Sequence, residues 1–169
     1  AANDDGSTDG GTTNGFTDGG TTDVGSVDGG ANERASIEMI EGFGGAVFDE
    51  ASSSYIFPTG SEVWAGFANL NTDVYPFTFA NGGSVTFTAA IPAGGSDTNI
   101  YFSFERLPHP DVEPSFNLDP ILIFGETELQ YTVAIPAQDP ANTYESFNLY
   151  LVDQDSSVII KDIVVTDDT

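Results

Sequence analysis

The spacing of apolar residues between Ser36 and Thr169 most constrains how this chain can fold. Short runs rich in Val, Ile, Phe, Tyr and Thr alternate there with Gly, Pro, Asn, Asp and Ser, and no long segment repeats apolar residues at helical spacing. This pattern predicts an all-β domain over residues 36–169, a two-sheet antiparallel β-sandwich of jelly-roll type. We expect strands at 37–41, 45–49, 54–58, 62–67, 73–79, 83–91, 98–106, 120–124, 127–135, 144–152 and 157–165.

Alternation along these runs separates a buried face from an exposed one, because successive side chains of a strand point to opposite sides of its sheet. The residues expected to be buried are Val85, Phe87, Ala89, Ile91, Ile100, Phe102, Phe104, Leu129, Tyr131, Val133, Ile135, Phe147, Leu149 and Leu151. If the strands at 98–106 and 144–152 are neighbours, one sheet exposes five side chains together: Tyr101, Ser103, Glu105, Asn148 and Tyr150.

Residues 1–35 differ sharply in composition from the rest of the chain. They are rich in Gly, Asp and Thr, and the fragment TDGGTT occurs at 8–13 and again at 17–22. Such a segment cannot bury enough apolar surface to offset the entropy lost on ordering, which predicts an acidic linker or leader. Self-association through residues 1–32 is the alternative.

Charge restricts the partners. The net charge is −24, from 27 acidic residues against three Lys and Arg. A chain of this kind repels nucleic acid and anionic lipid, and no apolar run is long enough to insert into a membrane. There is no cysteine, which excludes disulfides and thiol chemistry. We expect a secreted protein, located outside the cell or at its surface.

Calcium is the cation that such a chain would favour, because carboxylates are hard oxygen ligands. Asp49 and Glu50 close one expected strand, while Asp162 and Asp167 lie near the C-terminal end. The first and last strands of a jelly roll often lie side by side, so these groups are candidate ligands of a shared ion. A solvated acidic edge explains the same residues.

Catalytic chemistry finds little support. The single histidine, His109, lies between two prolines on a stiff loop, and no GxSxG motif accompanies it. Paired carboxylates carry little information in a chain with 27 acids. We therefore expect no enzymatic activity, and regard His109 as either a loop residue that touches a ligand or an incidental surface residue.

Aromatic and polar residues indicate a sugar site instead. Sugars offer apolar C–H faces to flat rings and hydroxyls to fixed donors and acceptors. Trp64 is the only tryptophan, and Tyr75 follows it closely. Arg106 is the only arginine in the expected domain, suited either to a structural ion pair or to bonds with hydroxyls. Trp64 suits either a core position or a ligand platform.

Several segments resemble accessory carbohydrate-binding β-sandwich modules attached to family-16 glycoside hydrolases of marine bacteria. The matching segments are FGGAVFDE at 43–50, FPTGSEVWAGFAN at 57–69, FERLPHPDVEPSF at 104–116, SFNLYLV at 146–152 and the closing IVVTDD. The resemblance covers about residues 36–168. The chain departs from the pattern at His109, where an aromatic residue is expected. The resemblance implies a non-catalytic module that binds a β-glucan or a related algal polysaccharide.

The resulting hypothesis is carbohydrate binding by aromatic stacking and polar contacts. The residues expected to carry it are Trp64, Tyr75, Arg106 and His109, with Glu105 and Asp111 orienting hydroxyls or the arginine. The alternative is a structural subunit of a calcium-stabilised extracellular filament or surface assembly, joined through the N-terminal leader.

Overall fold

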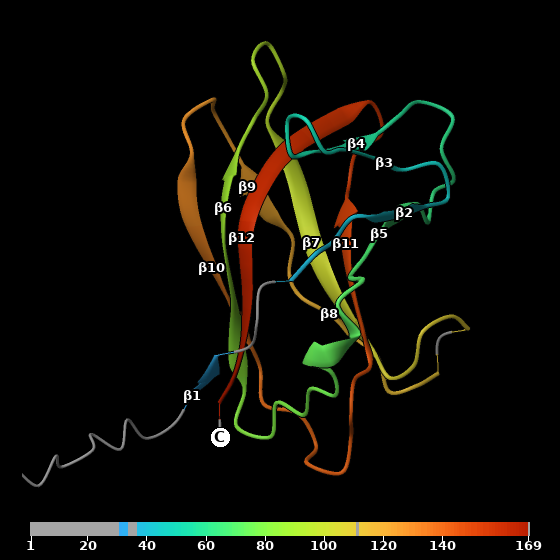
Figure 1. The fold of residues 1–169 in the computed structure, drawn as a ribbon, viewed down its shortest axis with the longest axis vertical. Coiled ribbons are helices and arrows are strands. Elements are labelled where there is room, and N and C mark those ends of the chain that lie inside the picture. Colours follow the sequence, from blue (N-terminus) through green and yellow to red (C-terminus); the bar gives the residue numbers. More distant parts are fainter. Residues whose placement is uncertain (1–30, 34–36, 111, 169) are drawn as a thin grey trace, which may run out of the picture.

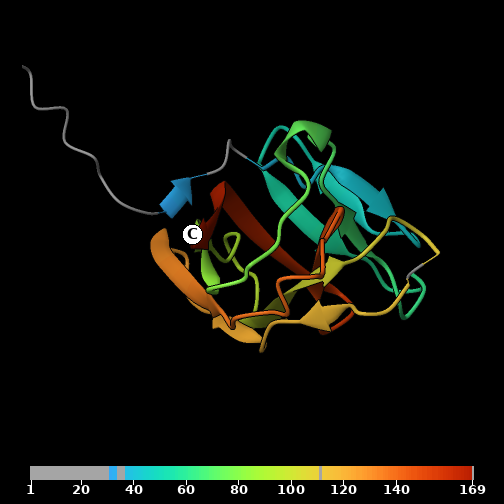
Figure 2. The same ribbon diagram turned by 90° about the horizontal axis from the view of Figure 1, so that it is seen from below.

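The computed structural model describes residues 31–33, 37–110 and 112–168, which form two antiparallel sheets packed face to face (Figures 1 and 2). The predicted all-β, two-sheet sandwich of jelly-roll type is confirmed. The part of the chain that the structure describes contains no helix long and apolar enough to cross a membrane. The predicted leader lies outside the described residues except for Ala31–Glu33, which pair with the C-terminal strand.

Sheet A has β12 at its centre, and this long strand pairs with β1, β4 and β6. The path through the sheet is β10-β6-β12-β4-β3, with β1 added beside β12 (Figure 1). Its strands are β1 (Ala31–Glu33), β3 (Val47–Asp49), β4 (Ser54–Phe57), β6 (Gly83–Ala90), β10 (Leu129–Ile135) and β12 (Ser156–Asp168).

Sheet B is built on β7 and β11, which pair along almost their whole length. The path is β2-β5-β11-β7-β8, and β9 also pairs with β7. Its strands are β2 (Glu41–Phe43), β5 (Gly66–Ala68), β7 (Thr98–Glu105), β8 (Phe116–Asn117), β9 (Ile121–Ile123) and β11 (Ser146–Leu151).

The strand predicted at 73–79 is wrong, and those predicted at 37–41 and 62–67 begin only at Glu41 and Gly66. A short 3₁₀ helix, η1 (Thr72–Val74), occupies the start of 73–79, and only an isolated bridge between Phe77 and Tyr144 follows. Pro76 lies in the middle of this run and has no backbone N–H to donate to a ladder. The side chain of Asn71 accepts a hydrogen bond from the Asp73 backbone N–H and so caps the turn.

Phenylalanine dominates the core between the sheets. Phe104 of β7 stacks on Phe147 of β11 with ring centroids 4.5 Å apart, and Phe77 meets the Phe104 ring edge-on at 5.8 Å. The predicted inward residues of β6, β7 and β11 are buried. Leu129 was expected to be buried too, but it is 39% exposed because β10 is an edge strand and Leu129 is its first residue.

Asp167 ties the end of β12 to the loop that precedes β6. Its carboxylate is 3% exposed and accepts hydrogen bonds from the Thr78 backbone N–H at 3.0 Å, the Thr78 hydroxyl at 3.2 Å and the Phe79 backbone N–H at 3.1 Å. Phe79 is fully buried, so its N–H has no water to replace this acceptor. The carboxylate therefore acts as a structural clamp.

We expect Asp167→Ala to lower the free energy of unfolding by about 2 to 3 kcal/mol, because it leaves buried donors without an acceptor. Urea denaturation of the domain measures this. Asp168→Ala is the matched control: it removes the same charge from an exposed neighbour. Equal effects of the two substitutions would contradict the clamp.

Candidate functional site

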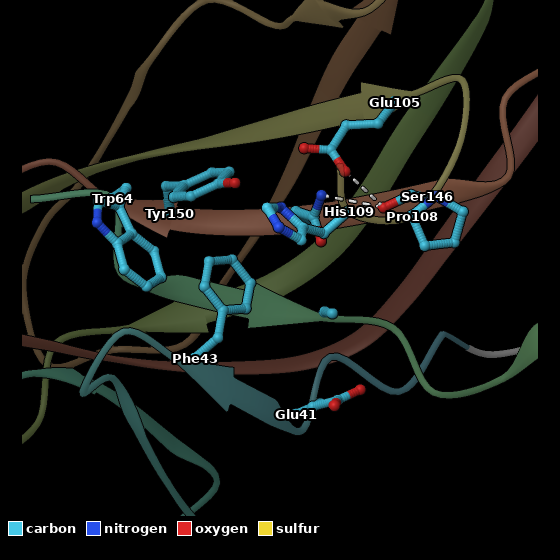
Figure 3. Close-up of a pocket in the computed structure, with 10 residues that line it drawn as sticks. Glu41, Phe43, Trp64, Glu105, Pro108, His109, Ser146 and Tyr150 are labelled. Carbon is cyan, nitrogen blue, oxygen red and sulfur yellow. Dashed lines mark hydrogen bonds between the residues drawn. The ribbon is translucent and has the colours of Figure 1, made fainter. Parts of the chain in front are cut away.

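A cleft of about 730 Å³ lies on the outer face of sheet B, on the side away from sheet A. Strands β2, β5, β7 and β11 form its floor, while the loops before β5 and after β7 form its walls (Figure 3). The lining residues are Glu41, Phe43, Trp64, Ala68, Glu105, Pro108, His109, Ser146, Asn148 and Tyr150. This cleft is the candidate site.

Strand register brings the floor residues together. Asn148 of β11 pairs with Ala68 of β5 on one side and with Ser103 of β7 on the other, and Tyr150 pairs with Tyr101. The five residues predicted to be exposed together thus lie on one face of sheet B, but Ser103 is buried, at 5% exposed. Asn148 itself is only 4% exposed, since it lies at the bottom of the cleft rather than on an open face.

Four aromatic rings form a strip across this face. Trp64 stacks beside Phe43 with centroids 6.3 Å apart and planes at 13°, and Phe43 meets Tyr150 edge-on at 5.9 Å. Tyr150 in turn stacks on Tyr101 at 4.9 Å and 14°. The indole remains 58% exposed. Each ring of the strip is therefore held by contact with the next ring. The indole of Trp64, at the end of the strip, leaves apolar surface open to solvent.

Two glycines make room for these rings. A Cβ at Gly66 would lie 2.7 Å from two ring carbons of Tyr150, so the tyrosine ring lies directly over the backbone of β5. Gly44 has φ +66°, and a Cβ there would lie 2.8 Å from the Ala65 Cα and 3.0 Å from Cζ3 of Trp64. The positions of both rings thus depend on backbone without side chains.

Polar groups line the cleft beside the strip. The Ser146 hydroxyl donates to the Glu105 carboxylate at 2.9 Å and accepts from the Asn148 side-chain amide at 3.1 Å (Figure 3). This chain of bonds orients Glu105 and Asn148 before any ligand arrives. Glu41 lies on the opposite side of the cleft (Figure 3).

A second hollow, of about 440 Å³, adjoins the cleft. Trp64, Glu105 and Tyr150 line both spaces. The residues that line the second hollow alone are Val63, Tyr101, Ser103, Glu113, Ser115, Phe116 and Asn117. The two hollows together form an elongated surface that is apolar at the strip and polar at both sides.

The structure brings three of the predicted ligand-binding residues into the cleft: Trp64, Glu105 and His109. His109 is exposed on the loop after β7. Arg106 follows β7 directly, and its backbone N–H donates to the Ser115 hydroxyl, but it lines neither hollow. Asp111 lies outside the described residues.

Tyr75 belongs to the core rather than to the cleft lining. Its ring meets Phe77 edge-on at 5.5 Å, and its hydroxyl accepts a hydrogen bond from the Asn69 side chain at 3.2 Å. Burial raises the pKa of Tyr75, and the hydrogen bond from Asn69 opposes that rise. Asn69 also forms hydrogen bonds with the backbone of Glu38 and Asn71, so this tyrosine is part of a structural hydrogen-bond network.

The four candidate calcium ligands do not gather. Asp49 pairs across β4 with the part of β12 near Ile159, and Asp167 lies eight residues farther along β12, roughly 25 Å at about 3.3 Å per residue. Asp49 accepts hydrogen bonds from its own turn, at the Ala51 backbone N–H and the Ser52 hydroxyl. Within the described ranges, no group of three or more His, Cys, Asp or Glu side chains is placed to hold a metal ion.

Sequence reasoning missed seven residues of the cleft as site residues: Glu41, Phe43, Ala68, Pro108, Ser146, Asn148 and Tyr150. Asn148 and Tyr150 had a usable signal, because alternation put them on one face with Tyr101. Glu41 and Phe43 had none, since β2 has only three residues and is too short to show alternation.

We expect Gly66→Ala to destabilise the domain by about 1 to 3 kcal/mol, because the new methyl overlaps the Tyr150 ring. The cost should be smaller in a Tyr150→Ala background, where the ring is gone. Unfolding free energies of the two single variants and the double variant measure this coupling. Strictly additive effects would show that the ring does not lie over Gly66.

Comparison with solved structures finds similar proteins at low sequence identity. A CBM22 xylan-binding domain of Xyn10C from Paenibacillus barcinonensis is 12% identical, with a TM-score of 0.51 over 83% of this chain and 87% of that one. A family 29 carbohydrate-binding module from Piromyces equi is 10% identical, with a TM-score of 0.46 over 83% and 82%. No family model and no curated protein matches the chain. The likeness to the xylan-binding domain shows a shared fold.

Proposed function

We propose that the cleft on sheet B binds a polysaccharide and does not cleave it. The observation that carries this proposal is the aromatic strip with Trp64 at its open end, next to hydrogen-bonded polar side chains. Flat rings match the apolar C–H faces of sugar rings, and fixed donors and acceptors match their hydroxyls. Contiguous apolar surface of this kind often marks a ligand-binding groove.

Binding rather than hydrolysis is supported by the placement of the cleft carboxylates. The backbones of Glu41 and Glu105 lie three strand positions apart in sheet B, roughly 14 Å at about 4.8 Å per step. Glycoside hydrolases usually hold their two carboxyl groups within about 9.5 Å, and backbones at this separation meet that requirement only if both side chains extend toward each other across the cleft. The cleft is therefore better suited to holding a chain than to cutting it.

The elongated surface suits an internal stretch of polysaccharide rather than a single sugar. The ligand class that the sequence resemblance implies is a β-glucan or related algal polysaccharide, and the domain of similar fold from Paenibacillus barcinonensis adds xylan to the candidates. Such ligands lie outside the cell, and we propose that the protein is located there too. We also propose that it is attached to a family-16 glycoside hydrolase. A single shallow cleft binds weakly, and linked modules raise the overall affinity.

We expect Trp64→Ala to weaken binding to its polysaccharide at least tenfold, a loss of about 1.4 kcal/mol or more, because the open end of the strip is removed. Affinity electrophoresis in gels containing laminarin, hydroxyethyl cellulose or arabinoxylan measures this. Phe124→Ala is the matched control, since that ring is 50% exposed but lines neither hollow.

A folded Trp64→Ala variant that the polysaccharide gel retards as strongly as it retards the native protein would refute the site. Reducing ends released from any of these polysaccharides by the purified protein would refute the non-catalytic role. Trp64 is the only tryptophan, so its fluorescence reports the same event independently. Bound polysaccharide should protect it from quenching by acrylamide.

A further inference from the structure

We infer that the cleft selects its ligand by charge: it accepts an uncharged polysaccharide and rejects one that bears carboxylate or sulfate groups. This inference rests on the proposed function and narrows it to a ligand class. It separates neutral glucans and xylans from the sulfated and uronic acid polymers that share the same environments.

The charged residues of the binding surface carry the inference. Glu41 and Glu105 line the cleft, and Glu105 and Glu113 line the second hollow. No Lys or Arg appears among the described residues that line either space. His109 is the one histidine among the lining residues, and it lies exposed on the loop after β7.

The two cations among the described residues, Arg106 and Lys161, line neither hollow. Of the chain's three Lys and Arg residues, Arg34 lies outside the described residues. Lys161 on β12 of sheet A pairs with Glu128. Anionic sugars are normally held by bidentate Arg or by Lys. The described part of this site offers neither.

The two cleft carboxylates flank any chain that lies on the aromatic strip. Glu41 projects from β2 on one side and Glu105 from β7 on the other (Figure 3). Glu105 is held by the Ser146 hydroxyl, and it borders both hollows. It is partly buried, where charges interact more strongly than in bulk water. An anionic substituent on a chain in the cleft therefore lies between two carboxylates, of which Glu105 is held in place.

The net charge of −24 also repels anionic polymers from a distance, so the test must separate this general effect from the cleft. Salt does so, because at about 1 M the screening length falls to roughly 3 Å. A matched pair of variants does so as well. Glu41→Gln with Glu105→Gln removes two charges from the cleft. Glu50→Gln with Asp139→Asn removes two exposed charges that line neither hollow.

The experiment measures affinity by titration calorimetry at about pH 8 for three pairs of polymers, each with one backbone. The pairs are laminarin and sulfated laminarin, hydroxyethyl and carboxymethyl cellulose, and arabinoxylan and glucuronoxylan. We expect at least one neutral member to bind, and its anionic counterpart to bind at least tenfold more weakly. The gap should narrow severalfold in the Glu41→Gln, Glu105→Gln variant and persist in the control variant.

Equal or tighter binding of the anionic member would overturn the charge selection and leave the proposed function intact. The charge selection would also be overturned if the difference in affinity between neutral and anionic polymers vanished equally in both variants, or vanished in about 1 M salt alone. The net charge of the whole chain would then explain that difference. Failure of all six polymers to bind the folded native protein would instead overturn the proposed function itself, and the charge selection with it.

Discussion

Burial of the apolar side of β7 and β11 between the two sheets is the constraint on which the site depends. Phe102, Phe104, Phe147 and Leu149 are fully buried there, and the two strands pair in one register that places Phe104 opposite Phe147. Because side chains alternate along a strand, every ring packed inward fixes a neighbour that points outward. A slip of one residue would turn both strands over and remove the cleft.

The site is completed by elements that pack little on their own. Phe43 lies on a strand of three residues, and Trp64 lies on the loop before β5. They are held by stacking on each other and by close contact of Trp64 with the backbone of Gly44. The long strands β7 and β11 thus form the rigid part of the floor, while the short β2 and the loop before β5 complete the site. The floor sets the polar contacts, while the wall supplies the exposed ring.

Sequence patterns predicted the part of the cleft on β7 and β11 well, and the part on β2 and the loop before β5 poorly. Alternation over eight residues of β7 and six of β11 is enough to assign faces, and the burial of Phe102 and Leu149 follows from it. Glu41 and Phe43 could not be assigned, because their neighbours come from pairing with β5, which is distant in sequence. Tyr75 was grouped with Trp64 by proximity in the chain, yet Pro76 and the hydrogen bond from Asn69 direct it to the core.

Negative charge acts both over the whole chain and inside the cleft. Throughout the chain, the excess of carboxylates favours solubility and keeps anions away. In the cleft, two of those carboxylates face the place where a ligand would lie. The charge selection that we propose rests on these two carboxylates, of which Glu105 is held by the Ser146 hydroxyl.

The central claim, that the outer face of sheet B is the binding surface, is tested most directly by nuclear magnetic resonance of the isotope-labelled protein during titration with a soluble neutral oligosaccharide. We expect the amide chemical shifts of Phe43, Trp64, Ser146 and Tyr150 to change, while those of β6 and β10 in sheet A stay constant. Shift changes gathered on sheet A, with the amides of the cleft unmoved, would contradict it.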